Sequence, residues 1–156
     1  MMFRHRSFLP AALAGLALIG RPAGADFAAG VEAYDGGDLA TAVAEWRAAM
    51  DDPDALVALA GLYAAGSGVA WDPGEAARLY RRAADLGNAD AQLNLGELYS
   101  QGRGVPRNLK LAYVWLSLAA EQGRRWPARQ LTEIAAQMSR TELDEARRLL
   151  DAWPRH

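Results

Sequence analysis

A segment of 36 residues occurs twice in succession, and this repetition constrains the fold more than any other feature of the sequence. Positions in residues 55–87 recur in residues 91–123, each 36 residues later and without a gap. In the first copy these positions are Leu59, Tyr63, Gly66, Gly68, Val69, Ala76, Ala83, Ala84 and Gly87. A fixed period of this length is typical of repeat proteins, in which each unit buries its apolar face against its neighbours. The sequence therefore predicts a stack of similar units.

Two amphipathic helices are expected in each unit. Apolar residues in 55–63 and again in 76–84 follow the spacing of one helical face. Between them, Gly66 suits the left-handed conformation that closes a helix. Asp72 is a good N-cap for the next helix, Pro73 suits the first helical position, and Glu75 completes a capping-box spacing.

Small residues in these helices indicate close packing. Alanines recur along both predicted helices, and Gly96 lies in the middle of one of them. A bulky side chain at Gly96 is expected to overpack the helix pair. Trp46 and Trp115 lie on apolar stripes and are expected in the core.

The recurring residues resemble a known family. Residues 95–105 read L-G-x-L-Y-x-x-G-x-G-V, and residues 59–69 match the same string with Ala60 in place of the glycine. This pattern resembles the Sel-1-like repeat, a longer relative of the tetratricopeptide repeat. The resemblance implies an all-α helical-repeat solenoid of about three to four antiparallel helix pairs, in which the first helix of each unit lines the concave surface.

The chain divides into five predicted segments. They are a signal peptide (1–25), a short tetratricopeptide-like first unit (26–53), two Sel-1-like repeats (54–89 and 90–123) and a C-terminal capping helix pair (124–156). In the last segment, Ser139 and Glu142 have the spacing of a capping box.

The first residues have the pattern of an export signal. Arg4 and Arg6 precede an apolar run at residues 8–19, and residues 23–25 read Ala-Gly-Ala. This arrangement is typical of a secretory signal peptide cleaved after Ala25, and the run is shorter than the roughly 20 residues that span a bilayer. We therefore expect an exported protein, periplasmic or secreted, with no stable membrane span after cleavage.

Charge argues against a nucleic-acid partner. The whole chain has 17 basic and 19 acidic residues, and removal of the signal segment would leave a net charge of −5. Affinity for nucleic acid depends largely on basic residues that neutralise phosphates.

Few residues here are suited to catalysis. The chain has no cysteine, and its histidines are His5, in the signal segment, and His156, the last residue. This composition argues against Ser-His or Cys-His nucleophiles and against His/Cys zinc sites. We expect a non-enzymatic protein without cofactor or metal. The cluster at Asp51, Asp52 and Asp54 fits a helix start better than a calcium loop.

The predicted function is binding of a protein or peptide in the concave groove. Projection of the period onto the first helices places nine residues there: Val57, Gly61, Ala64, Leu93, Glu97, Ser100, Trp126, Arg129 and Glu133. Such a lining suits a peptide better than a phosphate-rich ligand, although a solvated surface without a ligand remains an alternative. Exported relatives, as the resemblance implies, are often regulators or assembly factors of the bacterial cell envelope.

Two other functions stay open. A carbohydrate- or peptidoglycan-binding module would need exposed aromatic platforms, for which Trp71 and Trp126 are the candidates. Trp71 stands in a predicted turn, where it either packs locally or is an exposed anchor. A remote alternative is a glycosidase that uses Glu97 and Glu133, which are equivalent by the period, as its paired carboxylates.

Overall fold

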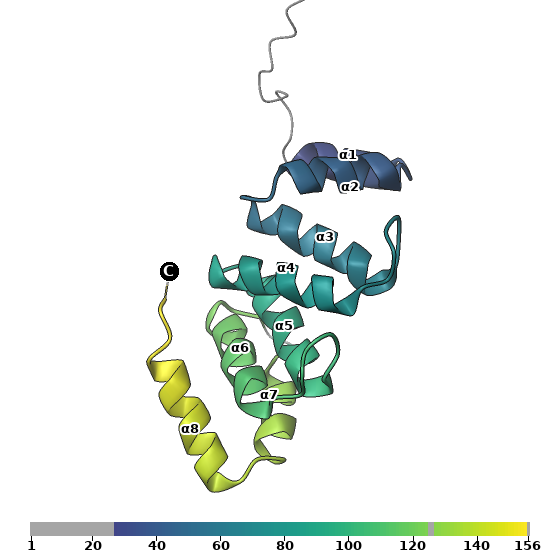
Figure 1. The fold of residues 1–156 in the computed structure, drawn as a ribbon. Coiled ribbons are helices and arrows are strands. Elements are labelled where there is room, and N and C mark those ends of the chain that lie inside the picture. The colour runs from purple at the N-terminus through teal and green to yellow at the C-terminus, as the bar shows by residue number, and fades with distance from the viewer. Residues whose placement is uncertain (1–26, 125–126, 156) are drawn as a thin grey trace, which may run out of the picture.

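The computed structural model describes residues 27–124 and 127–155, and the predicted signal peptide lies outside them. These residues form eight α-helices and contain no strand (Figure 1). The helices are α1 (Phe27–Asp35), α2 (Leu39–Ala48), α3 (Pro53–Ala65), α4 (Pro73–Asp85), α5 (Ala89–Gln101), α6 (Leu109–Glu121), α7 (Pro127–Ala135) and α8 (Arg140–Asp151). The predicted all-α solenoid is confirmed.

Helices that are neighbours in the sequence are neighbours in space. Within the units α1 packs on α2, α3 on α4 and α5 on α6, while α2, α4 and α6 each pack on the helix that follows. Figure 1 shows the resulting row, with α1 and α2 at one end and α7 and α8 at the other. In these three pairs each helix therefore packs most extensively on its partner, and the pairs pack on one another in sequence order, as in a repeat stack.

The paired glycines of each turn have two physical roles. Gly66 and Gly102 have φ near +69° and close α3 and α5 in the left-handed conformation, as predicted for Gly66. Gly68 and Gly104 also have positive φ, and each lies against the preceding unit. A Cβ at Gly68 would lie 2.8 Å from the Cβ of Leu39, and one at Gly104 would collide with the backbone carbonyl of Pro73.

Side-chain caps fix where the helices begin. The carboxylate of Asp72 accepts the backbone N–H of Glu75, and Ser139 and Glu142 form the complete capping box that the sequence predicts. The reciprocal half of the predicted box at Asp72 is absent because the Glu75 carboxylate binds the Arg78 guanidinium at 2.6 and 2.8 Å. A bidentate charged pair of this kind is stronger than a bond to one backbone N–H, and it lowers the pKa of Glu75.

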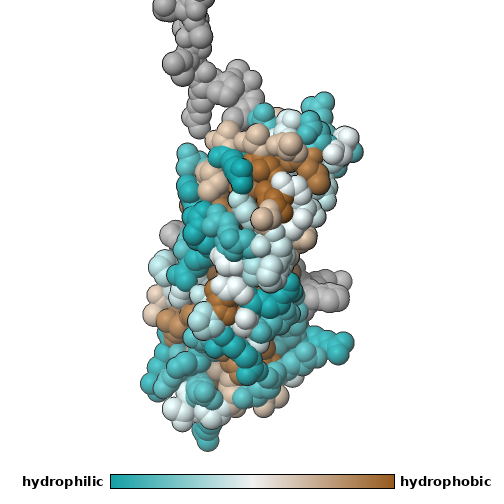
Figure 2. All heavy atoms as spheres, turned by 45° about the vertical axis from the view of Figure 1, so that its right-hand side comes forward, coloured by the Kyte–Doolittle hydropathy of each residue, from teal (hydrophilic) through white to brown (hydrophobic). Residues whose placement is uncertain are grey.

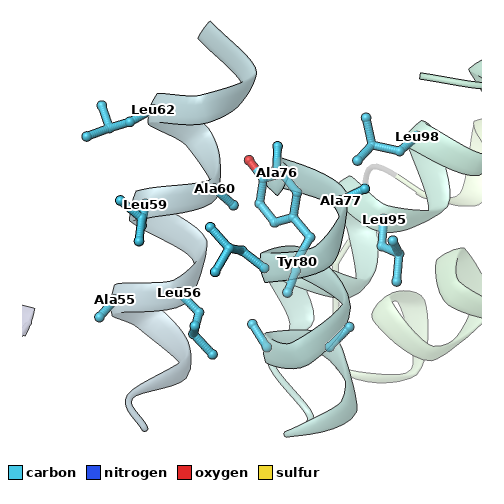
Figure 3. Close-up of a cluster of buried hydrophobic side chains, with 14 of the residues drawn as sticks. Ala55, Leu56, Leu59, Ala60, Leu62, Ala76, Ala77, Tyr80, Leu95 and Leu98 are labelled. Atoms are coloured by element: carbon cyan, nitrogen blue, oxygen red, sulfur yellow. The ribbon is translucent and has the colours of Figure 1, made fainter. Parts of the chain in front are cut away.

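The core runs through the interfaces of α3, α4 and α5 (Figure 3). Buried alanines on α4 let α3 and α5 approach it closely, and Figure 3 shows Leu56 and Ala60 on the side of α3 that faces α4. Trp46 and Trp115 are buried, as predicted. A Cβ at Gly96 would lie 2.6 Å from Cγ of Leu116, so the close approach expected at this glycine is present between α5 and α6.

The last two helices are arranged differently from the earlier pairs. Both α7 and α8 pack mainly on α6, so α8 turns back alongside α6 instead of pairing with α7 in the manner of α3 and α4 (Figure 1). At its end, the Trp153 ring meets the Trp115 ring edge to face, with 4.8 Å between centroids. The Arg81 guanidinium of α4 lies over both rings. The C-terminus is thus held against the two central units.

We predict that Gly96→Leu lowers the free energy of unfolding by about 1 to 3 kcal/mol, because the new side chain would overlap Leu116. Gly61→Leu on α3 is the control. A Cβ there meets only the Tyr80 hydroxyl within 4 Å, at 3.8 Å, and its helix propensity favours leucine by roughly 0.8 kcal/mol. Urea unfolding followed by circular dichroism compares the two, and equal stabilities would contradict the packing described.

We predict that Trp153→Ala lowers the free energy of unfolding by about 1 to 3 kcal/mol, because it removes aromatic contact with Trp115 and Arg81. Trp71→Ala is the matched control, since the Trp71 side chain is 65% exposed and should change stability by less than about 0.5 kcal/mol. Calorimetric melting of both variants tests this. A Trp153 variant that melts like the wild type would mean that the C-terminal contact contributes nothing.

Candidate functional site

The candidate site is the surface carried by α1, α3 and α5, which are the first helices of their pairs, and by α7, which follows them; we call it the first-helix face. Two hollows lie on it, one between α1 and α3 and the other between α5 and α7. Figure 2 shows brown, apolar side chains near the end of the molecule that carries α1 to α3, and mostly teal, polar ones farther along.

The α1/α3 hollow is apolar. Its volume is about 400 Å³. The lining residues are Phe27, Val31 and Tyr34 of α1, Trp46 of α2, Ala58, Gly61, Leu62 and Ala65 of α3, and Ser67 of the following turn. Tyr34 is 47% exposed, so part of the aromatic lining is open to solvent.

Trp46 holds α1 in the position that forms this hollow. Gly30 leaves room for the indole, because a Cβ at Gly30 would collide with the ring. The indole Nε1–H donates to the backbone carbonyl of Phe27 at 3.2 Å. Phe27 stacks on the Trp46 ring and Tyr34 tilts against it. The aromatic wall of the hollow is therefore fixed from below by a buried tryptophan.

Tyr80 of α4 lies near Gly61, which lines the α1/α3 hollow. Its ring projects from α4 toward α3 (Figure 3), and only 7% of the residue is exposed. The hydroxyl lies 3.8 Å from where a Cβ of Gly61 would stand. Burial, and after it the nearby carboxylate of Glu97, raise the pKa of Tyr80. The phenol is therefore neutral at physiological pH.

The α5/α7 hollow is smaller and polar, with a volume of about 200 Å³. Gln130 of α7 donates its amide N–H to the Glu97 carboxylate at 2.8 Å. Arg129 and Glu133 form an exposed ion pair at 2.9 Å. The Ser100 hydroxyl donates to the backbone carbonyl of Glu97 at 2.8 Å. This end of the face offers carboxylates and amides, whereas the other end offers aromatic and aliphatic surface.

Comparison with known proteins decides the family. Residues 53–88 and 89–123 each match the family model of the Sel1 repeat. Residues 53–123 of the chain are therefore two Sel1 repeats. Proteins built from Sel1 repeats are generally protein-interaction scaffolds.

Two solved structures share this fold. One is a protective antigen present in uropathogenic Escherichia coli strains, described as displaying an SLR fold, with a TM-score of 0.73 and 26% identity over 78% of this chain. The other is a Sel1 repeat protein from Oxalobacter formigenes, with a TM-score of 0.58 and 34% identity over 61% of this chain. The matches cover 27% and 39% of those chains.

A sequence relative is the alginate biosynthesis protein AlgK of Azotobacter vinelandii, which is 41% identical over 70 residues, or 45% of this chain. An F-box protein of Arabidopsis thaliana is 48% identical over 58 residues, or 35% of this chain. The matches cover 15% and 16% of these two proteins. Sel1 repeats thus occur as parts of longer proteins with different names.

The structure brings some of the predicted groove residues together and places others elsewhere. Glu97 is linked through Gln130 to the side of α7 where Glu133 lines the polar hollow together with Ser100. Val57 is half-buried and packs on the main core, whereas Leu93 packs against the small cluster formed by Ala112, Leu116 and Ile134. Both of these aliphatic side chains in the Sel1 units therefore contribute to packing.

Three further residues of the predicted groove lie in different surroundings. Gly61 lines the apolar hollow, Ala64 packs on the core, and Arg129 is almost fully exposed. Trp126 lies outside the described residues.

Trp71 is exposed, which answers the question that the sequence left open. It is 65% exposed in the turn between α3 and α4. Arg107, at the equivalent place in the second Sel1 repeat, instead donates to the backbone carbonyl of Ser100 and to the side chain of Gln137. Trp71 therefore has surface available for an apolar contact.

The aromatic residues of α1 were missed by projection of the period. Phe27, Val31 and Tyr34 belong to the short first unit, which lies outside the two matched Sel1 repeats. Their spacing of four and three residues on one helix could have identified them.

The carboxylates that the sequence singles out have structural partners in residues 27–124 and 127–155. Glu133 is exposed and paired with Arg129, whereas a general acid is usually held in an apolar pocket. Asp52 caps α3 by accepting the N–H of Asp54, and Asp51 pairs with Arg82, which confirms that this acidic cluster begins a helix. Among the described residues, no three His, Asp or Glu side chains gather as metal ligands. None of the described helices is long and apolar enough to cross a membrane.

Proposed function

We propose that this Sel1-repeat protein is a non-enzymatic scaffold that binds a peptide or protein segment on its first-helix face. The observation that carries the proposal is the α1/α3 hollow, where aromatic and aliphatic side chains surround about 400 Å³ that open to solvent. Burial of this surface by a partner would be favourable by about 25 cal/mol per Å² of apolar area.

The two ends of the face differ in a way that suits a partner lying across several units. An apolar side chain of the partner would occupy the α1/α3 hollow, and polar groups would meet the α5/α7 hollow near Glu97 and Glu133. Neighbouring helices in such packings lie about 8 to 10 Å apart, so the two hollows are separated by roughly 20 Å. An extended segment spans that distance with about six residues.

We propose further that the protein is exported and acts in the bacterial cell envelope. The charged start, apolar run and Ala-Gly-Ala sequence in residues 1–25 support export. A relative in alginate biosynthesis, as its name states, is in keeping with a role outside the cytoplasm. N-terminal sequencing of the chain purified after expression in a bacterial host should begin at Asp26, and an intact Met1 would contradict cleavage.

Affinity capture from envelope extract tests the scaffold. The wild-type chain should retain a protein that Ala65→Arg does not, because the arginine would occupy the α1/α3 hollow from an exposed position at the end of α3. Ala48→Arg is the matched control, since Ala48 is also exposed and ends a helix, α2, without lining the hollow.

Digestion of the extract with protease before capture identifies the kind of ligand. Loss of the retained species after digestion, together with its loss from Ala65→Arg, supports a protein partner on this face. Capture that survives digestion and depends on Trp71 would instead favour the carbohydrate-binding alternative. A retained protein that binds Ala65→Arg as well as wild type would overturn the proposed site.

A further inference from the structure

The α1/α3 hollow lies in the acidic part of the chain. Residues 27–72 contain eight acidic residues and one basic residue, whereas residues 73–156 contain ten acidic and thirteen basic ones. Figure 2 shows teal, polar side chains beside the brown, apolar ones at the end of the molecule that carries α1 to α3. A surface with an excess of one charge attracts partners of the opposite charge. A partner that enters the hollow therefore approaches a negative surface.

The single basic residue of this part of the chain does not neutralise α1. It is Arg47, whose guanidinium donates to the Tyr63 hydroxyl at 2.6 Å and lies over the Tyr63 ring. On α1, the side chains of Glu32 and Asp35 take part in no ion pair or hydrogen bond within the described residues. Both residues are exposed. Two carboxylates on α1 are therefore available to a partner.

Asp35 lies beside the apolar lining of the hollow. It directly follows Tyr34 and lies four residues after Val31, and both of these residues line the hollow. Side chains four residues apart on a helix are neighbours, with about 5 to 6 Å between their Cβ atoms. The helical spacing of α1 therefore places an exposed carboxylate next to the aromatic and aliphatic surface.

The surroundings of Asp35 within the protein disfavour its negative charge. Asp35 is the last residue of α1, and the last turn of this helix contains no basic residue. The carbonyl groups at the end of a helix carry a partial negative charge, which repels a carboxylate. Glu32 lies three residues earlier, so the two like charges are also neighbours on the helix. A cation supplied by a partner would relieve both repulsions.

We propose, resting on the scaffold function, that the segment bound in the α1/α3 hollow is a basic one. Its apolar side chain occupies the hollow, and a lysine or arginine pairs with Asp35. In an extended segment, side chains two residues apart lie on the same side, about 6.5 Å apart, which is close to the separation of Val31 and Asp35 along α1. The cation therefore lies two residues from the apolar side chain.

Three pools of fluorescein-labelled twelve-residue peptides test this chemistry by fluorescence anisotropy with the full chain. In the first pool a central Leu, Ile, Met or Phe has Lys two residues to either side, so the direction of binding does not matter. The second pool has Glu in place of Lys, and the third has Ser in place of the central apolar residue. The lysine pool should bind at least about tenfold more tightly than either of the others, since each lacks one of the two contacts.

Salt separates the two contacts. The preference for Lys over Glu should fall from at least about tenfold in about 10 mM salt to less than about threefold in about 1 M salt, because the Debye length falls from about 30 Å to about 3 Å. The preference for the apolar residue over Ser should persist at both concentrations, because burial of apolar surface does not depend on charge. A preference for Lys that salt leaves unchanged would contradict the ion pair.

Two charge reversals in the protein locate the ion pair. Asp35→Lys should reduce the preference for Lys over Glu to less than about threefold without lowering the melting temperature, since lysine suits the end of a helix. Asp151→Lys is the matched control. Asp151 is also exposed, is the last residue of α8, has no ion pair within the described residues and does not line the hollow. Its reversal changes the net charge equally and should leave the preference within about twofold of wild type.

The outcomes distinguish this inference from the scaffold function. Binding that Ala65→Arg abolishes but that is indifferent to Lys or Glu would overturn the inference and keep the scaffold. Equal loss of the preference in Asp35→Lys and Asp151→Lys would mean that net charge alone attracts the peptides, and would likewise overturn the inference alone. Failure of every pool to bind the wild type, or equal binding to Ala65→Arg, would overturn both.

Two other occupants are tested in the same assay. A chain that retains residues 1–25 and binds the lysine pool only after their removal would identify the chain's own basic and apolar leader as the occupant, and would overturn the proposal. Concentration-dependent dimerisation in sedimentation that both Ala65→Arg and Asp35→Lys abolish would identify a second copy instead, with the same consequence.

Discussion

The stack depends on close approach of backbones where one unit meets the next. Gly68 and Gly104 lie so near Leu39 and Pro73 of the preceding unit that a side chain could not be accommodated, and both have a φ that disfavours other residues. In each turn, one glycine therefore fixes the backbone conformation of the turn and also allows the close contact with the preceding unit. The helices between the turns follow, since alanines on α4 and Gly96 on α5 bring their axes close enough for leucines to fill the interfaces.

This packing also determines what the first-helix face presents. Two hollows lie between the first helices of successive units. The α1/α3 hollow exists because Gly30 admits the ring of Trp46, which in turn positions Phe27 and Tyr34. Gly30 therefore determines both the packing of α1 on Trp46 and the shape of the hollow.

Much of the fold could be predicted from the sequence, because a period of 36 residues repeats both the helix pattern and the turn chemistry. The left-handed Gly66 and the capping box at Ser139 are local features, and local geometry decides them. The site was predicted less well. The period assigns Val57 and Leu93 to the groove surface, yet both side chains are half-buried and pack against core clusters. The period alone does not predict these contacts, because they depend on side chains from other helices. The proximity of Tyr80 and Gly61 likewise joins two helices and has no signature along the chain.

The contact of Trp153 with Trp115 and Arg81 alters how such an array unfolds. A linear stack held only by neighbouring contacts can fray from its ends, one unit after another. Here positions 81 and 153 touch, so α8 cannot detach without exposing aromatic surface shared with α4 and α6. The C-terminal half should accordingly exchange its amide hydrogens as one cooperative unit, whereas the pair formed by α1 and α2, which has no such closure in the described structure, should open at lower free energy.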